Sequence, residues 1–209
     1  MTVTAIVPVD KRKCKVFLGE DFAFVLYKSE AARFHIEEEN ELSEQTYEKI
    51  KEEILLKRAR DRALYLLQSQ GRTKAEMIQK LQKDGYPDDV IREVMSFLEE
   101  YHFVDDSSYT ENYIHVNKSR KSPRQIVFEL QQKGVDKDTI SRMLEEAPIN
   151  EDDTVRVLLK KKTGGQIPAD WKERQKLAAF LGRKGFSFDV IQRVLRPSGG
   201  LFREEGILL

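Results

Sequence analysis

The chain has 209 residues, 40% of them hydrophobic and 34% charged, with equal numbers of basic and acidic residues and a single cysteine. This balance is typical of a soluble helical protein of a reducing compartment, and it excludes a disulfide-stabilised scaffold and a disordered chain. No apolar run is long enough to span a membrane and the first residues do not resemble a signal peptide, so we expect a cytoplasmic protein.

Three short segments near the N-terminus are rich in β-branched and aromatic residues, at 4–9, 14–19 and 22–27. Turn-forming residues separate them, so the pattern predicts two or three strands of a small antiparallel unit. Cys14 is expected to be a small residue within a strand and not a nucleophile. A short helix at 29–36, capped by Ser29, completes a predicted N-terminal extension over residues 1–42.

From Ser43 onward, hydrophobic residues recur at spacings of three and four residues, which predicts helix. The stretch allows either one long helix or two helices with a break near residues 55–58. Additional helices are expected to open the three units of the remaining chain, at 60–70, 106–120 and 151–162.

The remaining chain contains three similar segments. The segments LQKDGYPDDVI, LQQKGVDKDTI and LGRKGFSFDVI share a central glycine, at Gly85, Gly134 and Gly185. In each segment a leucine lies four residues before the glycine, an apolar residue follows it, and an isoleucine lies six residues after it. So many matching positions at one spacing indicate an internal repeat.

The helix starts within the repeats are also marked. Thr73 with Glu76, and Ser122 with Gln125, match the capping box, in which a side chain at each position bonds the backbone of the other. In the third copy the cap moves one turn earlier, to Asp170. The last helices of the three repeats are expected to begin after Pro87, Asp136 and Ser187.

Each repeat is therefore a unit of three helices that turns at its glycine. The sequence predicts a mainly α fold of three tandem three-helix, helix–turn–helix-like repeats in an elongated array, with the small β-strand extension at the N-terminus. The expected boundaries are 43–105 for the linker helix and first repeat, 106–148 and 149–197 for the second and third, and 198–209 for a flexible tail.

Catalytic signatures are missing from the sequence. The phosphate-binding, dinucleotide-binding, metalloprotease and paired-cysteine motifs do not occur, and the histidines are scattered over helical or helix-end positions: His35, His102 and His115. Asp105 and Asp106 are adjacent on a helix and diverge by about 100°, so we interpret Asp106 as the cap of a helix that begins at Ser107. We expect no catalytic residue, no metal and no cofactor.

The zero net charge conceals a basic C-terminal third. Residues 154–197 carry eleven Lys and Arg against three acids, whereas 37–53 and 88–106 are strongly acidic. A basic region favours a polyanionic partner, most simply nucleic acid, and a solvated helical surface is the alternative interpretation. The candidate nucleic-acid or filament contacts form two clusters: Lys118, Arg120, Lys121 and Arg124, then Lys160, Lys161, Lys162, Lys172, Arg174, Lys176, Arg183 and Lys184.

Aromatic residues offer a second means of binding bases, by stacking. We nevertheless interpret Tyr101, Tyr109 and Tyr113 as residues that pack between neighbouring repeats. Trp171, early in a predicted helix, is likewise expected to be a packing anchor and not a platform for a ligand.

Two segments are similar to a known family. The string HFVDDSSY, which follows LEEY, and the segment RKSPRQIVFELQQKGVDKDTI resemble the signature segments of the RecX family, the bacterial regulators of the RecA recombinase. The resemblance extends over about residues 59–195 and includes the three-unit organisation.

The resemblance implies regulation and not catalysis. Members of the family bind within the groove of the RecA filament on single-stranded DNA and limit its growth, ATP hydrolysis, strand exchange and cleavage of the LexA repressor. We expect a monomer that contacts this filament and single-stranded DNA, directly or through the filament. We further hypothesise that Glu93, Glu99 and Glu100 meet the recombinase while the basic third repeat faces DNA phosphates.

Two other functions stay open from the sequence. A helix–turn–helix-type protein that binds nucleic acid without the recombinase is the main alternative, although its third helices carry acids such as Asp88, Asp89 and Asp138. An enzyme is a more distant alternative, because no nucleophile–base pair or metal cluster can be assembled from the motifs.

Overall fold

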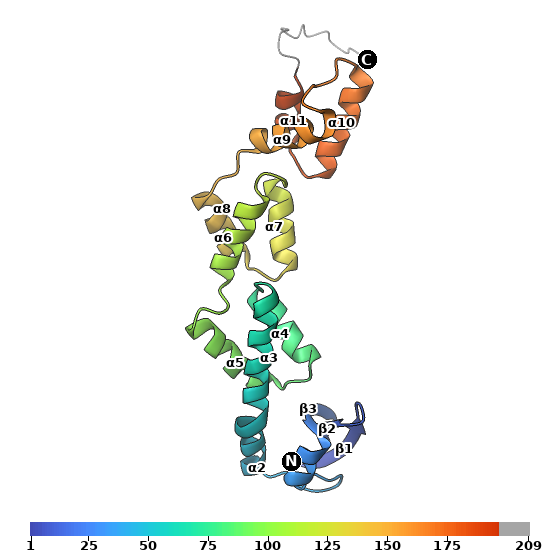
Figure 1. Ribbon diagram of the computed structural model, residues 1–209, viewed down its shortest axis with the longest axis vertical. Coiled ribbons are helices and arrows are strands. Elements are labelled where there is room, and N and C mark those ends of the chain that lie inside the picture. The colour runs from blue at the N-terminus through green and yellow to red at the C-terminus, as the bar shows by residue number, and fades with distance from the viewer. Residues whose placement is uncertain (197–209) are drawn as a thin grey trace, which may run out of the picture. The chain divides into compact units, whose positions relative to one another are not determined.

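A computed structural model describes residues 1–196, so the predicted tail at 198–209 lies outside the described residues. The chain divides into two compact units, Met1–Tyr109 and Thr110–Leu209. The protein is mainly helical and has a small sheet at its N-terminus, as predicted (Figure 1). In the described part of the chain, no helix combines the length and the apolar character that crossing a membrane requires.

The N-terminal extension contains an antiparallel sheet of strands β1 (Val3–Pro8), β2 (Lys13–Leu18) and β3 (Asp21–Tyr27), in that order. Side chains alternate between the two faces of a strand, so residues two apart share a face. The buried positions on β2 and β3 follow this rule: Cys14 and Val16, then Phe24 and Leu26. The predicted strands are confirmed to within about one residue.

Cys14 is a buried structural residue, as expected from the sequence. Its Sγ atom lies 3.7 Å from the carbonyl oxygen of Leu26 on the neighbouring strand. Burial raises the pKa of the thiol, which disfavours the reactive thiolate.

The short helix α1 (Lys28–Arg33) begins earlier than the sequence suggested. The expected cap, Ser29, lies inside the helix, and Tyr27 takes the capping position at the end of β3. The carboxylate of Glu30 accepts a hydrogen bond of 2.8 Å from the backbone amide of Tyr27. The acidic side chain at the third helical position therefore fixes the start, without a hydroxyl cap.

One continuous helix follows, so the two-helix alternative is wrong. It consists of α2 (Glu44–Ile50), a π-helical segment η1 (Lys51–Leu55) and α3 (Leu56–Ser69). Three consecutive residues at the π-helical segment are buried: Ile54, Leu55 and Leu56. A regular α-helix turns adjacent residues about 100° apart and cannot bury all three on one face, whereas the wider π turn shifts the buried stripe.

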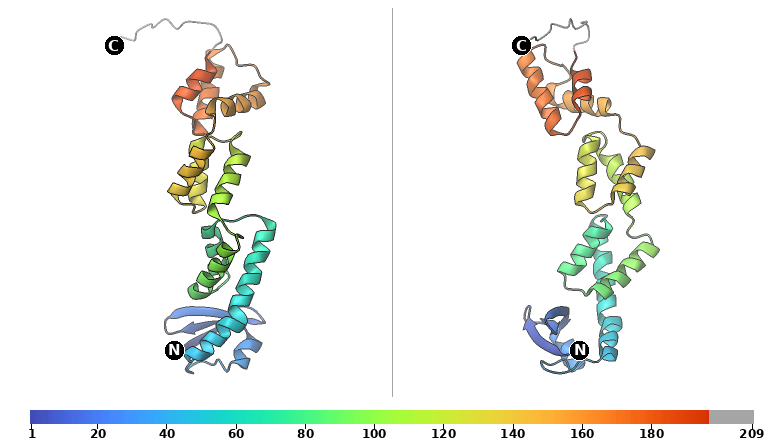
Figure 2. Two further views of the ribbon diagram at one scale, coloured as in Figure 1. Left: turned by 90° about the vertical axis from the view of Figure 1, so that its left-hand side faces the viewer. Right: turned by 180° about the vertical axis from the view of Figure 1, so that it is seen from behind.

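The first unit has one hydrophobic core that joins the sheet to the first repeat. The repeat consists of α3, α4 (Lys74–Lys83) and α5 (Asp88–Glu100), and the sheet lies beside the α2–α3 helix (Figure 2). Buried residues from every part contribute to this core, among them Phe24, Ile50, Met77, Leu81 and Val94. The β-rich extension is therefore packed on the repeat and is not an independent domain.

The second unit contains the remaining two repeats. Its helices are most of α6 (Asp106–Asn117), then α7 (Pro123–Gln132), α8 (Lys137–Glu146), α9 (Glu151–Thr163), α10 (Trp171–Arg183) and α11 (Phe188–Leu195). The third repeat has its own core, built on residues such as Val155, Leu177, Leu181 and Ile191. The glycines that close α4, α7 and α10 all have left-handed φ angles, as the repeat pattern predicts.

Most predicted helix starts are confirmed. Thr73 and Glu76 form the full capping box, and Asp136, Asp170 and Ser187 accept the expected backbone amides. Ser122 caps α7, but the return half of its box is absent within the described residues. The side-chain amide of Gln125 donates instead to the carboxylate of Glu129, at 3.1 Å.

The assignment of Asp106 as the cap of α6 is wrong. Asp105 takes that role, since its carboxylate accepts the amide of Ser107 at 2.8 Å and the hydroxyl of Ser108 at 2.8 Å. Asp106 accepts the backbone amide of Lys74 at 2.9 Å, at the start of α4. The two adjacent aspartates therefore serve two different helix starts, which local sequence could not distinguish.

Candidate nucleic-acid interface

The basic third repeat begins with α9, a helix whose charged residues complement its dipole. Acids occupy the first turn of α9, and Lys160, Lys161 and Lys162 occupy its last turn. This order stabilises a helix, because its C-terminal end carries partial negative charge. All three lysines are exposed, and none forms an ion pair with an acid of residues 1–196.

Two of the predicted nucleic-acid-binding lysines lie over the same aromatic ring. The ammonium groups of Lys162 and Lys184 lie 4.6 Å and 5.5 Å from the centre of the Phe180 ring. The ring face attracts both cations and orders side chains from the ends of α9 and α10. The fold thus gathers positive charge from two segments that are separated in sequence by the glycine-containing loop and α10.

The remaining candidates on α10 differ in availability. Lys172 and Arg183 are exposed, without an ion pair to a described acid. Lys176 pairs with Glu173 at 2.8 Å, and this hydrogen bond raises the pKa of the lysine. Arg174 donates from Nη2 to the carbonyl oxygen of Ala169 at 2.7 Å. Lys176 is thus partly neutralised by its own helix.

Lys121 is an internal structural cation and not a free surface charge. Its ammonium donates to the carboxylate of Glu129 at 2.5 Å and to the hydroxyl of Tyr113 at 2.9 Å. Partial burial opposes its charge, but these hydrogen bonds raise the pKa of Lys121 above its ordinary value. Because Glu129 already neutralises its charge within this network, Lys121 is the weakest of the twelve candidates.

The two basic clusters meet in space. The hydroxyl of Ser122, at the start of α7, donates to the carbonyl oxygen of Lys184 at 2.7 Å. Arg124, the second residue of α7, lies against the turn at Gly185, where a Cβ atom added to the glycine would stand 3.7 Å from the Arg124 Cβ. Arg124 and Lys184, far apart in sequence, therefore lie at the junction of the second and third repeats.

The other two members of the first cluster make different contacts. Arg120 donates from Nη2 to the carbonyl oxygen of Val116 at 3.1 Å, within its own segment. The side chain of Lys118 is exposed, while its carbonyl oxygen accepts the hydroxyl of Thr154 at 2.6 Å. Lys118 thus belongs to a second backbone link between the repeats of this unit.

The acidic candidates lie on α5 in the first unit. Glu93 pairs with Lys51 at 2.5 Å, and Glu99 pairs with Lys74 at 2.8 Å. Glu100 is exposed and forms no ion pair with a charged group of residues 1–196. Of the three, Glu100 is therefore the carboxylate that a partner would reach without displacing a lysine.

The packing interpretation of two aromatic residues is wrong. Trp171 is 65% exposed and Tyr101 is 60% exposed. Tyr101 contacts rings of its own repeat, with its ring centre 4.9 Å from that of Phe97. The sequence alone could not show that either ring is exposed, because an aromatic residue in a predicted helix is more often a packing residue than an exposed one.

Comparisons with known proteins match all three repeats to one family. Sequence models of the first, second and third three-helix domains of RecX match residues 59–98, 105–144 and 150–195. A "Regulatory protein RecX" of Bacillus velezensis is 33% identical over 190 residues, covering 88% of this chain and 71% of the relative. The chain belongs to the RecX family.

Other RecX relatives extend the match beyond the repeats. The "Regulatory protein RecX" of Caldanaerobacter subterraneus subsp. tengcongensis is 29% identical and covers 93% of this chain and 98% of its own length. That of Clostridium botulinum (strain Eklund 17B) is 27% identical, over 90% and 91%. Since these alignments cover 93% and 90% of this chain, they include most of residues 1–58. These RecX relatives therefore also have a segment that aligns with the N-terminal extension.

Solved RecX structures have the same fold. One, described as the crystal structure of regulatory protein RecX, matches with a TM-score of 0.59 at 24% identity over 92% of this chain and 98% of its own. RecX from Lactobacillus salivarius matches with a TM-score of 0.55 at 23% identity, over 67% and 94%. At this identity the likeness establishes the fold alone.

Proposed function

We propose that this protein regulates a RecA-type recombinase. It binds along the RecA–single-stranded DNA filament and limits filament growth, ATP hydrolysis, strand exchange and LexA cleavage. The observation that carries the proposal is the match of three consecutive RecX domains within one chain. Relatives that match most of its length are named regulatory proteins, which fits a function of binding and not of catalysis.

The charge distribution supports this proposal. A filament of protein on DNA offers both a protein surface and a polyanion, so a ligand of it benefits from surfaces of both signs. Glu100 on α5 is an available carboxylate, and Lys160–Lys162 form an available cationic cluster. In the proposed complex the acidic face of the first repeat contacts recombinase, and the third repeat faces DNA phosphates.

A helix–turn–helix protein that acts on DNA alone is the second candidate function. Such a protein places the third helix of a repeat in the major groove. In all three repeats this helix has an acid in its first turn: Asp88 and Asp89 in α5, Asp138 in α8 and Asp189 in α11. Carboxylates at these positions would be repelled by the phosphates that border the groove, which favours the recombinase proposal.

A binding comparison separates the two functions. Recombinase is assembled on single-stranded DNA with a slowly hydrolysed ATP analogue, and the same DNA without recombinase and matched duplexes serve as the other ligands, all at one salt concentration. The proposal predicts that the filament binds this protein more tightly than either DNA. Discrimination among duplex sequences with no gain from recombinase would favour the helix–turn–helix function.

A further inference from the structure

The third repeat carries an apolar groove between α10 and α11. Its floor contains the buried side chains of Ile191 and Leu195, and its volume is about 430 Å³. Sites for small ligands have volumes of about 300–1,000 Å³. The groove is thus large enough to hold planar groups of the size of nucleobases.

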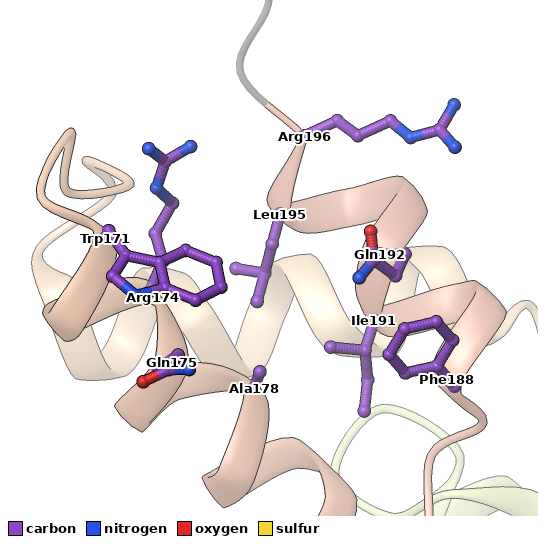
Figure 3. A pocket seen from close by; sticks show the side chains of 9 residues that line it. All are labelled: Trp171, Arg174, Gln175, Ala178, Phe188, Ile191, Gln192, Leu195 and Arg196. Carbon is purple, nitrogen blue, oxygen red and sulfur yellow. The ribbon is translucent and has the colours of Figure 1, made fainter. Parts of the chain in front are cut away.

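Two exposed aromatic rings border this groove. Trp171 is the first residue of α10 and is 65% exposed, and Phe188 is the first residue of α11 and is 72% exposed. Figure 3 shows the two rings on opposite sides of the groove, with Leu195 between them. They are therefore two separate flat surfaces and not the two walls of one narrow slot.

The three-helix fold does not require these aromatic residues. When the repeats are aligned on their glycines, the positions of Trp171 and Phe188 hold small or charged residues in the other copies: Gly71 and Asp88, then Arg120 and Lys137. Trp171 also belongs to an added helical turn, since α10 has 13 residues whereas α4 and α7 have 10. Since the other repeats fold without these rings, their exposure requires another explanation.

The charged residues that line the groove have one sign. Arg174 and Arg196 line it, and no acid does so among the described residues. In Figure 3 the Arg174 guanidinium extends upward above Trp171, and the Arg196 side chain extends to the right, above Gln192. The buried Nε of Arg174 has no hydrogen-bond partner within residues 1–196. The groove thus combines exposed rings with cations and a buried donor.

We propose that this groove binds single-stranded nucleic acid, with bases stacked on Trp171 and Phe188 and phosphates beside Arg174 and Arg196. Single strands expose both the flat faces and the backbone charges that this arrangement matches, whereas a duplex hides its base faces. The proposal deepens the DNA-binding half of the proposed function and adds an aromatic site to the lysine cluster. An apolar peptide does not need an exclusively cationic rim, so it is the less suitable occupant.

The single tryptophan of the chain provides a direct test. Fluorescence of Trp171 is recorded while the full-length protein is titrated with an oligothymidylate, without recombinase and at fixed salt. An abasic oligonucleotide of the same length supplies the same backbone charge without bases. Stacking predicts strong quenching by the oligothymidylate and little by the abasic strand. Equal quenching by both strands, or binding that leaves the fluorescence unchanged, would overturn the proposal.

Variants locate the second ring. Phe188→Ala should weaken oligothymidylate binding at least about fivefold, the loss typical of one stacked base. Phe128→Ala is the matched control, because Phe128 is 60% exposed on α7 outside the groove, and it should change affinity less than twofold. Equal effects of the two variants would contradict the assignment. An apolar peptide that shifts Trp171 emission when the oligothymidylate does not would assign the groove to a protein partner.

The recombinase assay keeps the two proposals separate. If wild-type protein inhibits ATP hydrolysis by the recombinase but Trp171 does not respond to bases, the groove proposal fails and the regulatory function stands. If Trp171 responds to bases and the protein leaves the recombinase unaffected, the groove stands and the regulatory function fails.

Discussion

The side chain of Ser122 joins two repeats with one oxygen atom. It accepts the amide of Gln125 at 3.1 Å, which caps α7, and donates to the carbonyl oxygen of Lys184 at 2.7 Å. The residue is fully buried. A cap that is local in the sequence is thus also a long-range link, and it fixes the start of α7 against the turn between α10 and α11.

Removing this hydroxyl should destabilise the second unit. Ser122→Ala loses a cap, which contributes about 1 kcal/mol, and leaves the Lys184 carbonyl without its donor, for a total loss of about 2 kcal/mol. Ser187→Ala is the control, since Ser187 caps α11 with an exposed side chain. Urea unfolding measures both changes, and equal losses for the two variants would show that the link to Lys184 contributes nothing.

Gly185 should tolerate a side chain less well than Gly164. Both have left-handed φ angles, of +83° and +70°, which cost an alanine about 1–2 kcal/mol. A Cβ on Gly185 would stand 2.9 Å from the Ser122 Oγ, whereas one on Gly164 meets nothing within 4 Å. We expect Gly185→Ala to lower the free energy of unfolding by at least about 1 kcal/mol more than Gly164→Ala.

A double variant tests the cause of that difference. If the Ser122 hydroxyl is the obstacle, Ser122→Ala and Gly185→Ala should be less than additive by at least about 0.5 kcal/mol. Strict additivity would mean that backbone strain alone explains the loss.

Glu129 should make stability depend on pH. Partial burial disfavours its charge, but hydrogen bonds from Lys121, Tyr113 and Gln125 hold its pKa below the ordinary 4.5. A lowered folded-state pKa stabilises the protein above the unfolded-state pKa, and this contribution disappears as pH falls through the folded-state value. Glu129→Gln should therefore cost about 1–3 kcal/mol at neutral pH and progressively less below about pH 4.5.

The control for Glu129 is Glu145→Gln, at an exposed position of α8. Chemical denaturation of the three proteins at a series of pH values gives the comparison. A difference between wild type and Glu129→Gln that stays constant down to pH 3 would contradict the proposed role of the ionised carboxylate.

Features set by neighbouring residues were predictable from the sequence. The strands, the turn glycines and the caps at Thr73, Asp136 and Ser187 depend on a few adjacent positions, and the threefold repetition made them easier to recognise. Residues 59–195 also carried the family resemblance that the RecX domain matches confirm.

Features set by tertiary contacts were not predictable. Lys121 belongs to a run of basic residues in the sequence, but it pairs with Glu129, which lies eight residues later on α7. Asp105, and not Asp106, caps α6, because the start of α4 approaches α6 and Asp106 accepts the amide of Lys74. The groove was not predicted, because Trp171 was interpreted as a packing anchor and only the described fold shows that Trp171 and Phe188 are both exposed.

Charge reversal should reveal the DNA-facing lysines. Changing Lys160, Lys161 and Lys162 to Glu removes an exposed cluster without breaking an ion pair with residues 1–196. Affinity for single-stranded DNA should fall, and the slope of log affinity against log salt should shrink by about 0.7 for each lost phosphate contact. The readout is fluorescence anisotropy of labelled DNA over a salt series.

A matched triple reversal controls for net charge. Three exposed cations of the first unit lie outside both basic clusters: Lys11 and Arg12 in the turn between β1 and β2, and Lys15 on β2. Reversing them should reduce affinity less and leave the salt slope nearly unchanged. If the two triple variants behave alike, only overall charge matters and the third repeat has no special position on DNA.

The central claim is regulation of the recombinase, and the most direct measurement is ATP hydrolysis by the cognate RecA on single-stranded DNA as this protein is titrated in at fixed salt. The proposed function predicts inhibition at well below one protein per recombinase subunit, because a ligand bound along a filament affects several subunits. Unchanged hydrolysis at every ratio, under conditions in which the protein binds the bare DNA tightly, would contradict it.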